Sequence, residues 1–291
     1  VKLLIFGAGG FIGSNLVEHL IEQGEHEVVG LDVTDEKLAG IEGPNFRFVK
    51  GNISDADLAN KLVADTDVVV DLIAYANPSI YVEKPLDVVH LNFFENMKIL
   101  EYCLTHGKRL IQYSTSEIYG KRTRDERYND DHSDLVMGPV QKQRWIYASS
   151  QQLLERIIYA HGIEGDLDDS IIRPFNFVGP RFDYLVPAGS KGGPRVFSHF
   201  LSALLTGGPI HLVDGGDKHR CFTHIKDACE AFSAILESPE ASNEIFNVGN
   251  PETNITMRGL AQMMQKIYGE LTGTKPENEF IDIDGEDFYG K

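Results

Sequence analysis

A tyrosine and a glutamine stand four residues apart in WIYASSQQLLERIIYAHG, residues 145–162, a pattern that predicts a helix. Residues four apart share one face of a helix, so Tyr147 and Gln151 are expected to be neighbours. A phenol can act as an acid–base group when a nearby cation lowers its pKa. Glutamine can bind a ligand through its amide but carries no charge. A positive charge about 5 Å from the phenol would favour its ionised form by roughly 3 kcal/mol at an effective dielectric of 20, or about two pKa units. Glutamine does not supply this charge.

A second polar group, Thr115, Ser116 and Glu117, comes directly after an apolar run at 108–114 that reads as a strand. Ligands of an open parallel sheet bind at the carboxyl ends of its strands, so these side chains stand where a ligand would lie. Each also has a structural interpretation. Ser or Thr can close a strand, Glu can lie in a solvated turn, and Tyr147 can fill a core helix.

Strand-like and helical patterns alternate over the first 173 residues. The strand-like runs are β-branched and almost continuously apolar, as expected when helices cover both faces of a parallel sheet. This alternation predicts an α/β fold with a doubly wound parallel (Rossmann) sheet. The predicted strands are 2–6, 26–33, 46–49, 67–74, 108–114 and 169–175, and the predicted helices lie near 12–23, 55–65, 85–106 and 147–161.

The pattern changes at Pro174, where a segment rich in Gly and Pro begins. We expect a nucleotide-binding domain at 1–173 and a smaller C-terminal substrate-binding region at 174–291. One strand, NEIFNVGN at 243–250, is expected to return to the first domain.

A glycine motif, GAGGFIG, joins the first strand to the first helix. Gly7, Gly10 and Gly13 can form a tight turn and let backbone amides approach a pyrophosphate at the helix N-terminus. Asp32, at the end of the second strand, is placed to accept hydrogen bonds from an adenosine ribose, which favours NAD over NADP. The other residues expected around NAD are Phe11, Ile12, Asn52, Ile53, Ala74, Tyr147 and Gln151.

Taken in order, these motifs resemble the extended short-chain dehydrogenase/reductase family, in its nucleotide-sugar branch. The segments GAGGFIG, STSEIYG, YASSQ and RPFNFVGPR fall in the family's order and cover essentially the whole chain. More narrowly, STSEIYG, GPVQKQRWIY, LVDGGDKHRCFTHIKD and FNVGNPE resemble UDP-glucuronate decarboxylases and UDP-apiose/xylose synthases. In this family the residue at the position of Gln151 is a lysine.

The resemblance implies oxidation of UDP-glucuronate at C4, with NAD⁺ as hydride acceptor and Tyr147 as base. The resulting ketone is β to the carboxylate, so that CO₂ can leave and give a stabilised enolate. Thr115 would bind the C4 oxygen, and Ser116 and Glu117 would act near the carboxylate and C5. Glu117 speaks against a plain 4-epimerase. Ser116, where plant apiose-forming enzymes have cysteine, speaks against ring contraction.

The resemblance also implies a substrate site in the later part of the chain. Asn176, Arg195 and Arg220 would contact the UDP diphosphate, for which guanidinium geometry is well suited. Arg173 is expected to be structural. His211 is as well explained by a half-exposed strand position as by a ligand contact. The remaining candidates for the substrate site are Tyr81 and Arg181.

The formal charge of −17 excludes nucleic acid and anionic membranes as expected partners, because the field of the chain repels phosphate. Three cysteines without metal-ligand spacing predict no metal site and fit a reducing compartment. The chain opens on a strand without a signal peptide or membrane-spanning run, so a cytoplasmic protein is expected. Apolar residues on two predicted helices favour a homodimer with a four-helix interface: Leu91, Phe94, Leu100, Leu154, Ile157 and Ile158.

The sequence ends at EDFYGK, where relatives continue with helices that carry a catalytic arginine. We therefore expect these 291 residues to be part of a longer protein. Three functions remain open. The first is decarboxylation of UDP-glucuronate to a UDP-4-keto-pentose or UDP-xylose, slowed by Gln151. The second is a UDP-apiose/xylose synthase or UDP-sugar 4-epimerase, and the third is a catalytically weak protein that binds NAD and a UDP-sugar.

Overall fold

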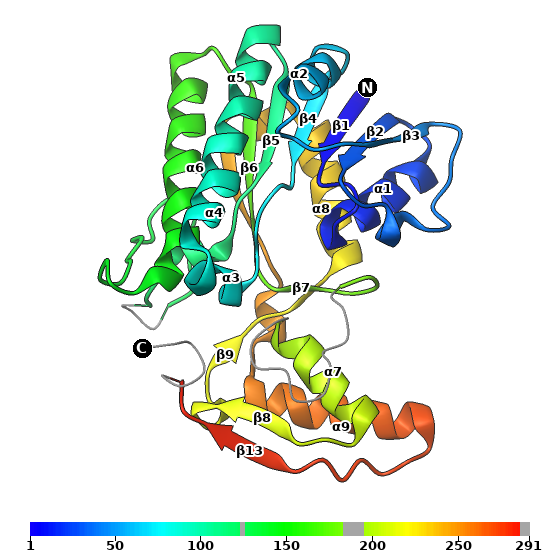
Figure 1. Ribbon diagram of the computed structural model, residues 1–291, viewed down its shortest axis with the longest axis vertical. Helices are drawn as coiled ribbons and strands as arrows, with labels where there is room; N and C mark the ends of the chain where they lie inside the picture. Colours follow the sequence, from blue (N-terminus) through cyan, green and yellow to red (C-terminus); the bar gives the residue numbers. More distant parts are fainter. Residues whose placement is uncertain (123–125, 183–194, 286–291) are drawn as a thin grey trace.

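The computed structural model describes residues 1–122, 126–182 and 195–285, and its centre is a parallel sheet of seven strands (Figure 1). The strand order β11-β6-β5-β4-β1-β2-β3 reverses at β1, which confirms the predicted doubly wound fold. The strands are β1 Lys2–Phe6, β2 Glu27–Asp32, β3 Phe46–Lys50, β4 Val68–Asp71, β5 Arg109–Tyr113, β6 Asp169–Pro174 and β11 Glu244–Val248.

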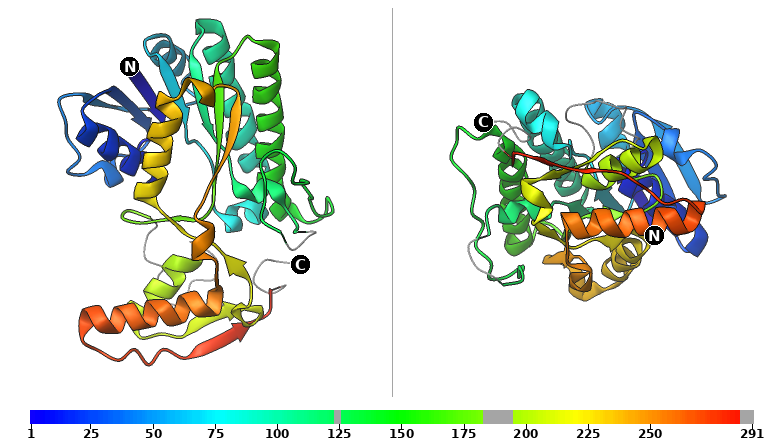
Figure 2. Two further views of the ribbon diagram at one scale, coloured as in Figure 1. Left: turned by 180° about the vertical axis from the view of Figure 1, so that it is seen from behind. Right: turned by 90° about the horizontal axis from the view of Figure 1, so that it is seen from below.

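Helices cover both faces of this sheet, which explains why its strands are almost continuously apolar. Leu3 and Ile5 of β1 point into one core with α1 and α8, whereas Leu4 and Phe6 point into a second core with α2, α5 and α6. Figure 2 shows α8 lying across the rear face. The helices are α1 Phe11–Gln23, α2 Ala56–Ala64, α5 Asn96–His106, α6 Ile146–Glu164 and α8 Ile225–Glu237.

The helix predicted at 85–106 is not continuous. It consists of α4 (Pro85–Val89), a π-helical turn η2 (His90–Glu95) and α5. Asn92 accepts a hydrogen bond from the Tyr75 amide at 2.8 Å, and Asn96 donates to the Ile73 carbonyl at 3.0 Å. The wider turn lets both side chains reach the backbone that follows β4. The periodicity of apolar residues in the sequence does not predict such a turn.

Residues after Pro174 do not form a separate unit, because the chain crosses between the sheet and a smaller region several times. β11 pairs with β6 in parallel, and α8 packs on the sheet, so both belong to the larger layer. The smaller region lies beyond the carboxyl ends of the strands (Figure 1). Its elements are β7 Phe177–Val178, α7 Val196–Thr206, β8 Ile210–Val213, β9 His219–Arg220, β10 Thr223–His224, β12 Ile255–Thr256, α9 Met257–Thr272 and β13 Phe280–Ile283.

Short helical turns connect these elements and carry several residues of interest. They are η1 Glu36–Leu38, α3 Pro78–Glu83, η3 Ser116–Tyr119, η4 Gln143–Trp145, η5 Asp214–Gly216, η6 Pro239–Ala241 and η7 Pro251–Thr253. Within the described part of the chain, no helix combines the length and apolar character needed to cross a membrane. Residues 286–291, where a C-terminal continuation was expected to begin, lie outside the described residues.

The apolar residues expected at a dimer interface are mostly core residues. Leu100, Leu154 and Ile158 are fully buried against the sheet. Leu91 and Ile157 pack on the same core. The helices meet both the sheet and one another, so their buried stripe is wider than one row of residues. The large apolar side chains exposed on this helical layer include Leu86, Phe94, Leu153, Tyr159 and Ile163.

Candidate active site

The glycine loop brings the start of α1 close to β1 and β2. Gly7 has a left-handed backbone (φ 83°) and donates its amide to the Leu31 carbonyl at 2.9 Å. A Cβ at Gly13 would overlap the Gly7 carbonyl oxygen, and one at Gly9 would overlap the Thr34 carbonyl oxygen. The loop therefore needs glycine for close backbone approach, as a dinucleotide-binding turn does.

Asp32 lies beside this loop, as the ribose-binding hypothesis requires. Its carboxylate accepts hydrogen bonds from the amides of Gly9 at 3.0 Å and Thr34 at 3.1 Å, which fix its orientation. The nearby Lys37 donates to the carbonyls of Arg181 at 2.6 Å and Phe182 at 2.9 Å. A carboxylate at this strand end fits an adenosine ribose better than a 2′-phosphate.

Other predicted cofactor residues take different positions. Phe11 is buried and lies edge-on to Phe182, with ring centroids 5.0 Å apart, while Ile12 packs against the same core. Ile53 is buried in the core beneath β2. The Asn52 side chain accepts hydrogen bonds from the amide of Ser54 at 3.0 Å and its hydroxyl at 2.9 Å. Its carbonyl oxygen therefore shapes the turn, and its amide nitrogen is the group that remains for a ligand.

Tyr147 is the centre of a compact group at the carboxyl end of the sheet. Its ring stacks on that of Tyr81, with centroids 4.6 Å apart and planes 10° apart, and Ala74 packs against the cluster that they form with Val88. The Thr115 side chain lies beside the Tyr147 phenol. Burial, followed by the charge of Glu117, raises the pKa of Tyr147 well above its ordinary value, whereas Thr115 and Arg195 lower it.

Gln151 occupies the next turn of α6 and is buried, with 1% of its surface exposed. Within the described residues its amide oxygen, Oε1, has no hydrogen-bond partner. A buried polar atom without a partner is costly, so a ligand that donates a hydrogen bond there would be favoured. The nicotinamide ribose has such hydroxyl groups. Gln151 thus fits the binding task of the usual lysine but not its electrostatic task.

Ser116 and Glu117 begin η3, directly after the Thr115 hydroxyl that accepts a hydrogen bond from the Glu117 amide at 3.1 Å. Ser116 is half-buried, and the Glu117 side chain keeps 36% of its surface exposed. Burial raises the pKa of the Glu117 carboxyl, while the charges of Arg144 and Arg220 lower it. Glu117 is therefore recessed among protein atoms but still reachable from solvent.

The arginines have unequal roles. Arg195 stacks on Phe182, with its guanidinium carbon 3.9 Å from the ring centroid, and its charge acts on Tyr147. Arg220 is exposed on β9, and its charge lowers the pKa of the Glu117 carboxyl. Arg173 forms a buried ion pair with Glu155 at 2.7 Å, consistent with a structural role.

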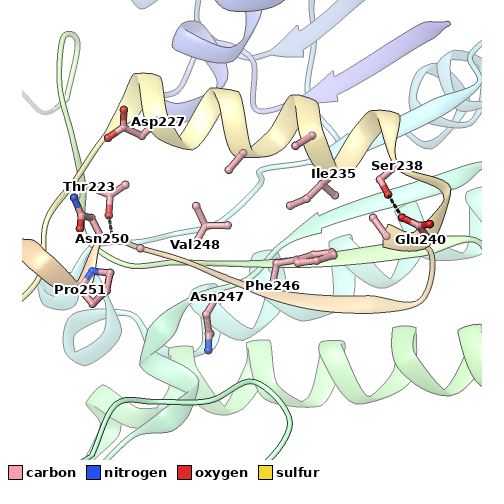
Figure 3. A pocket seen from close by; sticks show the side chains of 14 residues that line it. Thr223, Asp227, Ile235, Ser238, Glu240, Phe246, Asn247, Val248, Asn250 and Pro251 are labelled. Carbon is pink, nitrogen blue, oxygen red and sulfur yellow. Dashed lines mark hydrogen bonds between the residues drawn. The ribbon is translucent and has the colours of Figure 1, made fainter.

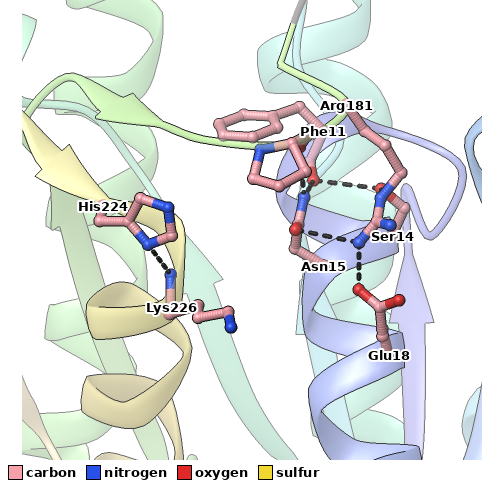
Figure 4. Close-up of polar contacts among 8 residues, drawn as sticks. Phe11, Ser14, Asn15, Glu18, Arg181, His224 and Lys226 are labelled. Atoms are coloured by element: carbon pink, nitrogen blue, oxygen red, sulfur yellow. Dashed lines mark hydrogen bonds and ion pairs between the residues drawn. The ribbon is translucent and has the colours of Figure 1, made fainter. Parts of the chain in front are cut away.

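Arg181, predicted to contact the substrate, is engaged by residues of α1 in this structure. Figure 4 shows its guanidinium turned toward α1, where it donates to Ser14 at 3.2 Å, Asn15 at 2.9 Å and Glu18 at 2.5 Å. Its backbone is left-handed (φ 61°), which reverses the chain at this point. These contacts give Arg181 a structural role between α1 and β7.

Two further predicted substrate residues lie in the smaller region. Asn176, also left-handed (φ 44°), donates to the Cys221 carbonyl at 2.9 Å and so ties β7 to the segment after Arg220. His211 is exposed on β8 and pairs in register with Ile281 of β13. Its role as a ligand residue stays a prediction.

A groove of about 680 Å³ lies elsewhere, between α8 and β11 (Figure 3). Asp227 and Ile235 line it from the helix, and Phe246 and Val248 line it from the strand. None of the residues predicted to bind NAD or a UDP-sugar takes part in its lining. The groove is therefore separate from the group around Tyr147.

Arg144 and Trp145 belong to the site and were missed from the sequence. The guanidinium of Arg144 lies 3.8 Å from the Glu117 carboxylate. The signal that could have revealed it is spacing, because Arg144 precedes Tyr147 by three residues at the start of a helix.

Comparison with known proteins supplies independent evidence. The model of the NAD dependent epimerase/dehydratase family matches residues 3–249. UDP-D-apiose/UDP-D-xylose synthase 2 of Arabidopsis thaliana is 39% identical over 316 aligned positions, which cover 100% of this chain and 81% of that protein. The corresponding enzyme of Oryza sativa subsp. japonica is also 39% identical, with 79% of its length covered.

Solved structures share the same fold. The PbgP3 protein of Burkholderia pseudomallei has a TM-score of 0.89 and 35% identity, covering 97% of this chain and 86% of that one. The UDP-glucuronic acid 4-epimerase of Bacillus cereus, solved with UDP-glucuronic acid and NAD, has a TM-score of 0.79 and 23% identity, covering 98% and 86%. At that identity the second likeness concerns the fold alone.

Proposed function

Because the chain belongs to the NAD dependent epimerase/dehydratase family, we propose that it oxidises UDP-glucuronate at C4 and decarboxylates it. The observation that carries this proposal is the recessed Glu117 carboxyl beside the Tyr147–Thr115 pair, within the field of two arginines. Positive charge at this point suits a substrate that brings a carboxylate of its own. The 39% identity to UDP-apiose/UDP-xylose synthases over the full chain supports a decarboxylating reaction.

NAD⁺ supplies the hydride acceptor for this reaction. Tyr147 takes the proton from the C4 hydroxyl group, and Thr115, which lies beside Tyr147, orients the same oxygen. Oxidation places a ketone β to the carboxylate, so the C5–carboxyl bond can break with its electrons delocalised into the ketone. We propose that Ser116 and Glu117 act near C5, which must then be protonated.

The binding roles follow from the same geometry. The glycine loop and Asp32 would hold the adenosine half of NAD, and Gln151 would accept a hydrogen bond from the nicotinamide ribose. We propose that the smaller region, with Arg195 and Arg220, holds the UDP part of the substrate. We also propose a cytoplasmic location, which the charge of −17 and the few cysteines favour.

A UDP-apiose/UDP-xylose synthase is the second candidate, and its support is the identity to the plant enzymes. Ser116 is the residue that argues against it, since those enzymes resemble this chain but carry cysteine there. Of the three described cysteines, Cys103 and Cys229 are buried in the two sheet cores, and Cys221 is half-buried next to Arg220.

One incubation separates the candidates. The protein is mixed with NAD⁺ and UDP-glucuronate, CO₂ is measured, and the sugar is identified by NMR. CO₂ with UDP-xylose or the 4-keto-pentose supports the proposal, and CO₂ with a branched furanose supports the second candidate. UDP-galacturonate without CO₂ indicates a 4-epimerase. Binding of both ligands by calorimetry without any product indicates a binding protein. Tyr147→Phe, which keeps the stack on Tyr81, is the matched control.

A further inference from the structure

Trp145 fixes the segment that leads into α6. A Cβ at Gly138 would overlap the indole Nε1, so the ring fills the space that this glycine leaves. The guanidinium carbon of Arg144 lies 4.6 Å from the centroid of the same ring. A cation over an indole face is attracted by the ring's quadrupole, and a planar guanidinium is well suited to stack there. Trp145 therefore holds Arg144 in one place.

Arg144 in turn faces Glu117. Its Nη2 lies 3.8 Å from Glu117 Oε2, and the two side chains are 32% and 36% exposed. This distance is too long for a hydrogen bond, so Arg144 acts on Glu117 through its charge. Both groups are shielded from bulk water more than surface residues are, which makes the charge more effective than in an exposed pair.

Glu117 acts on Tyr147 in the opposite sense, because a carboxylate beside a phenol opposes loss of the phenolic proton. The other groups around Tyr147 are Thr115 at the end of β5, Tyr81 on α3, Arg195 at the start of α7 and Gln151 on α6. Gln151 brings no charge. Within the described residues, the positive charges that oppose the effect of Glu117 therefore come from arginines rather than from the usual lysine.

We infer that Arg144, held by Trp145, is a positioning residue for the oxidation step: it pairs with Glu117 and so offsets the negative charge beside Tyr147. The inference rests on the proposed role of Tyr147 as base. A unit charge about 10 Å away at an effective dielectric of 20 shifts a pKa by about one unit. Loss of Arg144 should thus reduce the tyrosinate fraction, and the oxidation rate, about tenfold at a given pH.

The first measurement does not need turnover. The Glu117 carboxyl is titrated by infrared spectroscopy in the NAD-bound protein, as the difference from Glu117→Gln. Arg144→Gln should raise the pKa of Glu117 by about one unit, because the paired cation is lost. Arg127→Gln is the matched control, since it removes the same charge from an exposed arginine paired with Glu252. An unchanged Glu117 titration in Arg144→Gln overturns the inference whether or not the enzyme is active.

The second measurement is single-turnover formation of NADH with saturating UDP-glucuronate, at a pH above the measured pKa of Glu117. Arg144→Gln should slow it about tenfold, and Arg144→Lys should restore part of the rate by returning the charge. In the Glu117→Gln background the same Arg144 substitution should still slow the reaction, because the charge of Arg144 also acts on Tyr147 directly. If Arg144→Lys recovers none of the rate in either background, the role is merely structural and the inference is overturned. If the unaltered protein binds both ligands but forms no NADH, the proposed function fails instead.

Discussion

Replacing Gln151 with lysine tests the central electrostatic feature of the site. The side chain at this position is buried one helical turn from Tyr147, so its head group lies about 5–6 Å from the phenol. A positive charge there is worth roughly 3 kcal/mol at an effective dielectric of 20, or about two pKa units. Because burial and Glu117 raise the pKa of Tyr147, the unaltered protein should hold little tyrosinate at neutral pH.

Gln151→Lys should therefore accelerate the oxidation step about a hundredfold at neutral pH. The pH profile of both forms should rise toward alkaline pH, with the lysine form displaced by about two units to lower pH. Since the Gln151 amide oxygen has no partner within the described residues, the substitution sacrifices no hydrogen bond of that atom. The new ammonium group is desolvated, which lowers its own pKa and makes the estimate an upper one.

The assay is single-turnover appearance of NADH absorbance against pH, with UDP-glucuronate in excess. Gln152→Lys is the matched control, because it adds the same charge to the same helix on a half-buried face turned away from Tyr147. It should change the rate less than threefold. If Gln151→Lys is no faster at any pH, Tyr147 is not the base. If both forms are fast at neutral pH, the electrostatic reasoning is wrong.

Three other predictions concern the cofactor, the stability and the assembly. Asp32→Ala should weaken NAD⁺ binding and narrow its advantage over NADP⁺ in calorimetry, because the ribose loses its acceptor. Burial raises the pKa of Asp71 to about 7. Asp71→Asn should therefore increase the free energy of unfolding, and the increase should be about 3 kcal/mol larger at pH 8 than at pH 5. We propose a homodimer through the outer surface of α5 and α6, so light scattering should give a dimer mass, and Leu153→Glu should give a monomer.

The sign of the Asp71 prediction follows from proton binding. Between pH 4 and pH 7 the folded protein keeps a proton that the unfolded chain releases, so stability falls as the pH rises through this window. Asparagine removes that penalty and can still accept the Ile73 amide hydrogen bond. Equal effects of Asp71→Asn at both pH values would contradict it. Equal affinity of the unaltered protein for NAD⁺ and NADP⁺ would contradict the Asp32 prediction. A monomeric mass at micromolar concentration would contradict the homodimer.

The sheet could be predicted from the sequence because its physical signal is local. β1 is apolar from Leu3 to Phe6 because Leu3 and Leu4 face opposite sides of the sheet that are both covered by helices. The turn at Gly7 could be predicted for a related reason, because its backbone geometry demands glycine whatever lies around it. Fold and cofactor loop were thus readable from single segments.

The rest depended on contacts between distant segments. The orientation of Arg181 toward α1 follows from its left-handed backbone. Sequence patterns do not predict this conformation in a residue other than glycine. The pairing of Arg144 with Glu117 joins two loops that meet only when the sheet forms. The π-helical turn at 90–95 and the buried position of Leu154 depend on how helices pack on one another. Helical periodicity in the sequence shows which face of a helix is apolar, but it does not show how many neighbouring elements pack against that helix.

The return of β11 to the sheet sets the order in which the protein can be completed during synthesis. β6 ends at Pro174, yet its partner, Glu244–Val248, follows about 70 residues later, after α7, β8 and α8 have been made. While the ribosome adds those residues, β6 is the edge of the nascent sheet, with unpaired backbone groups and the apolar Ile171 and Ile172. If synthesis stopped before residue 248, the unpaired edge of β6 would be free to pair with other chains. Dependence on chaperones should therefore be greatest while the residues between β6 and β11 are being made.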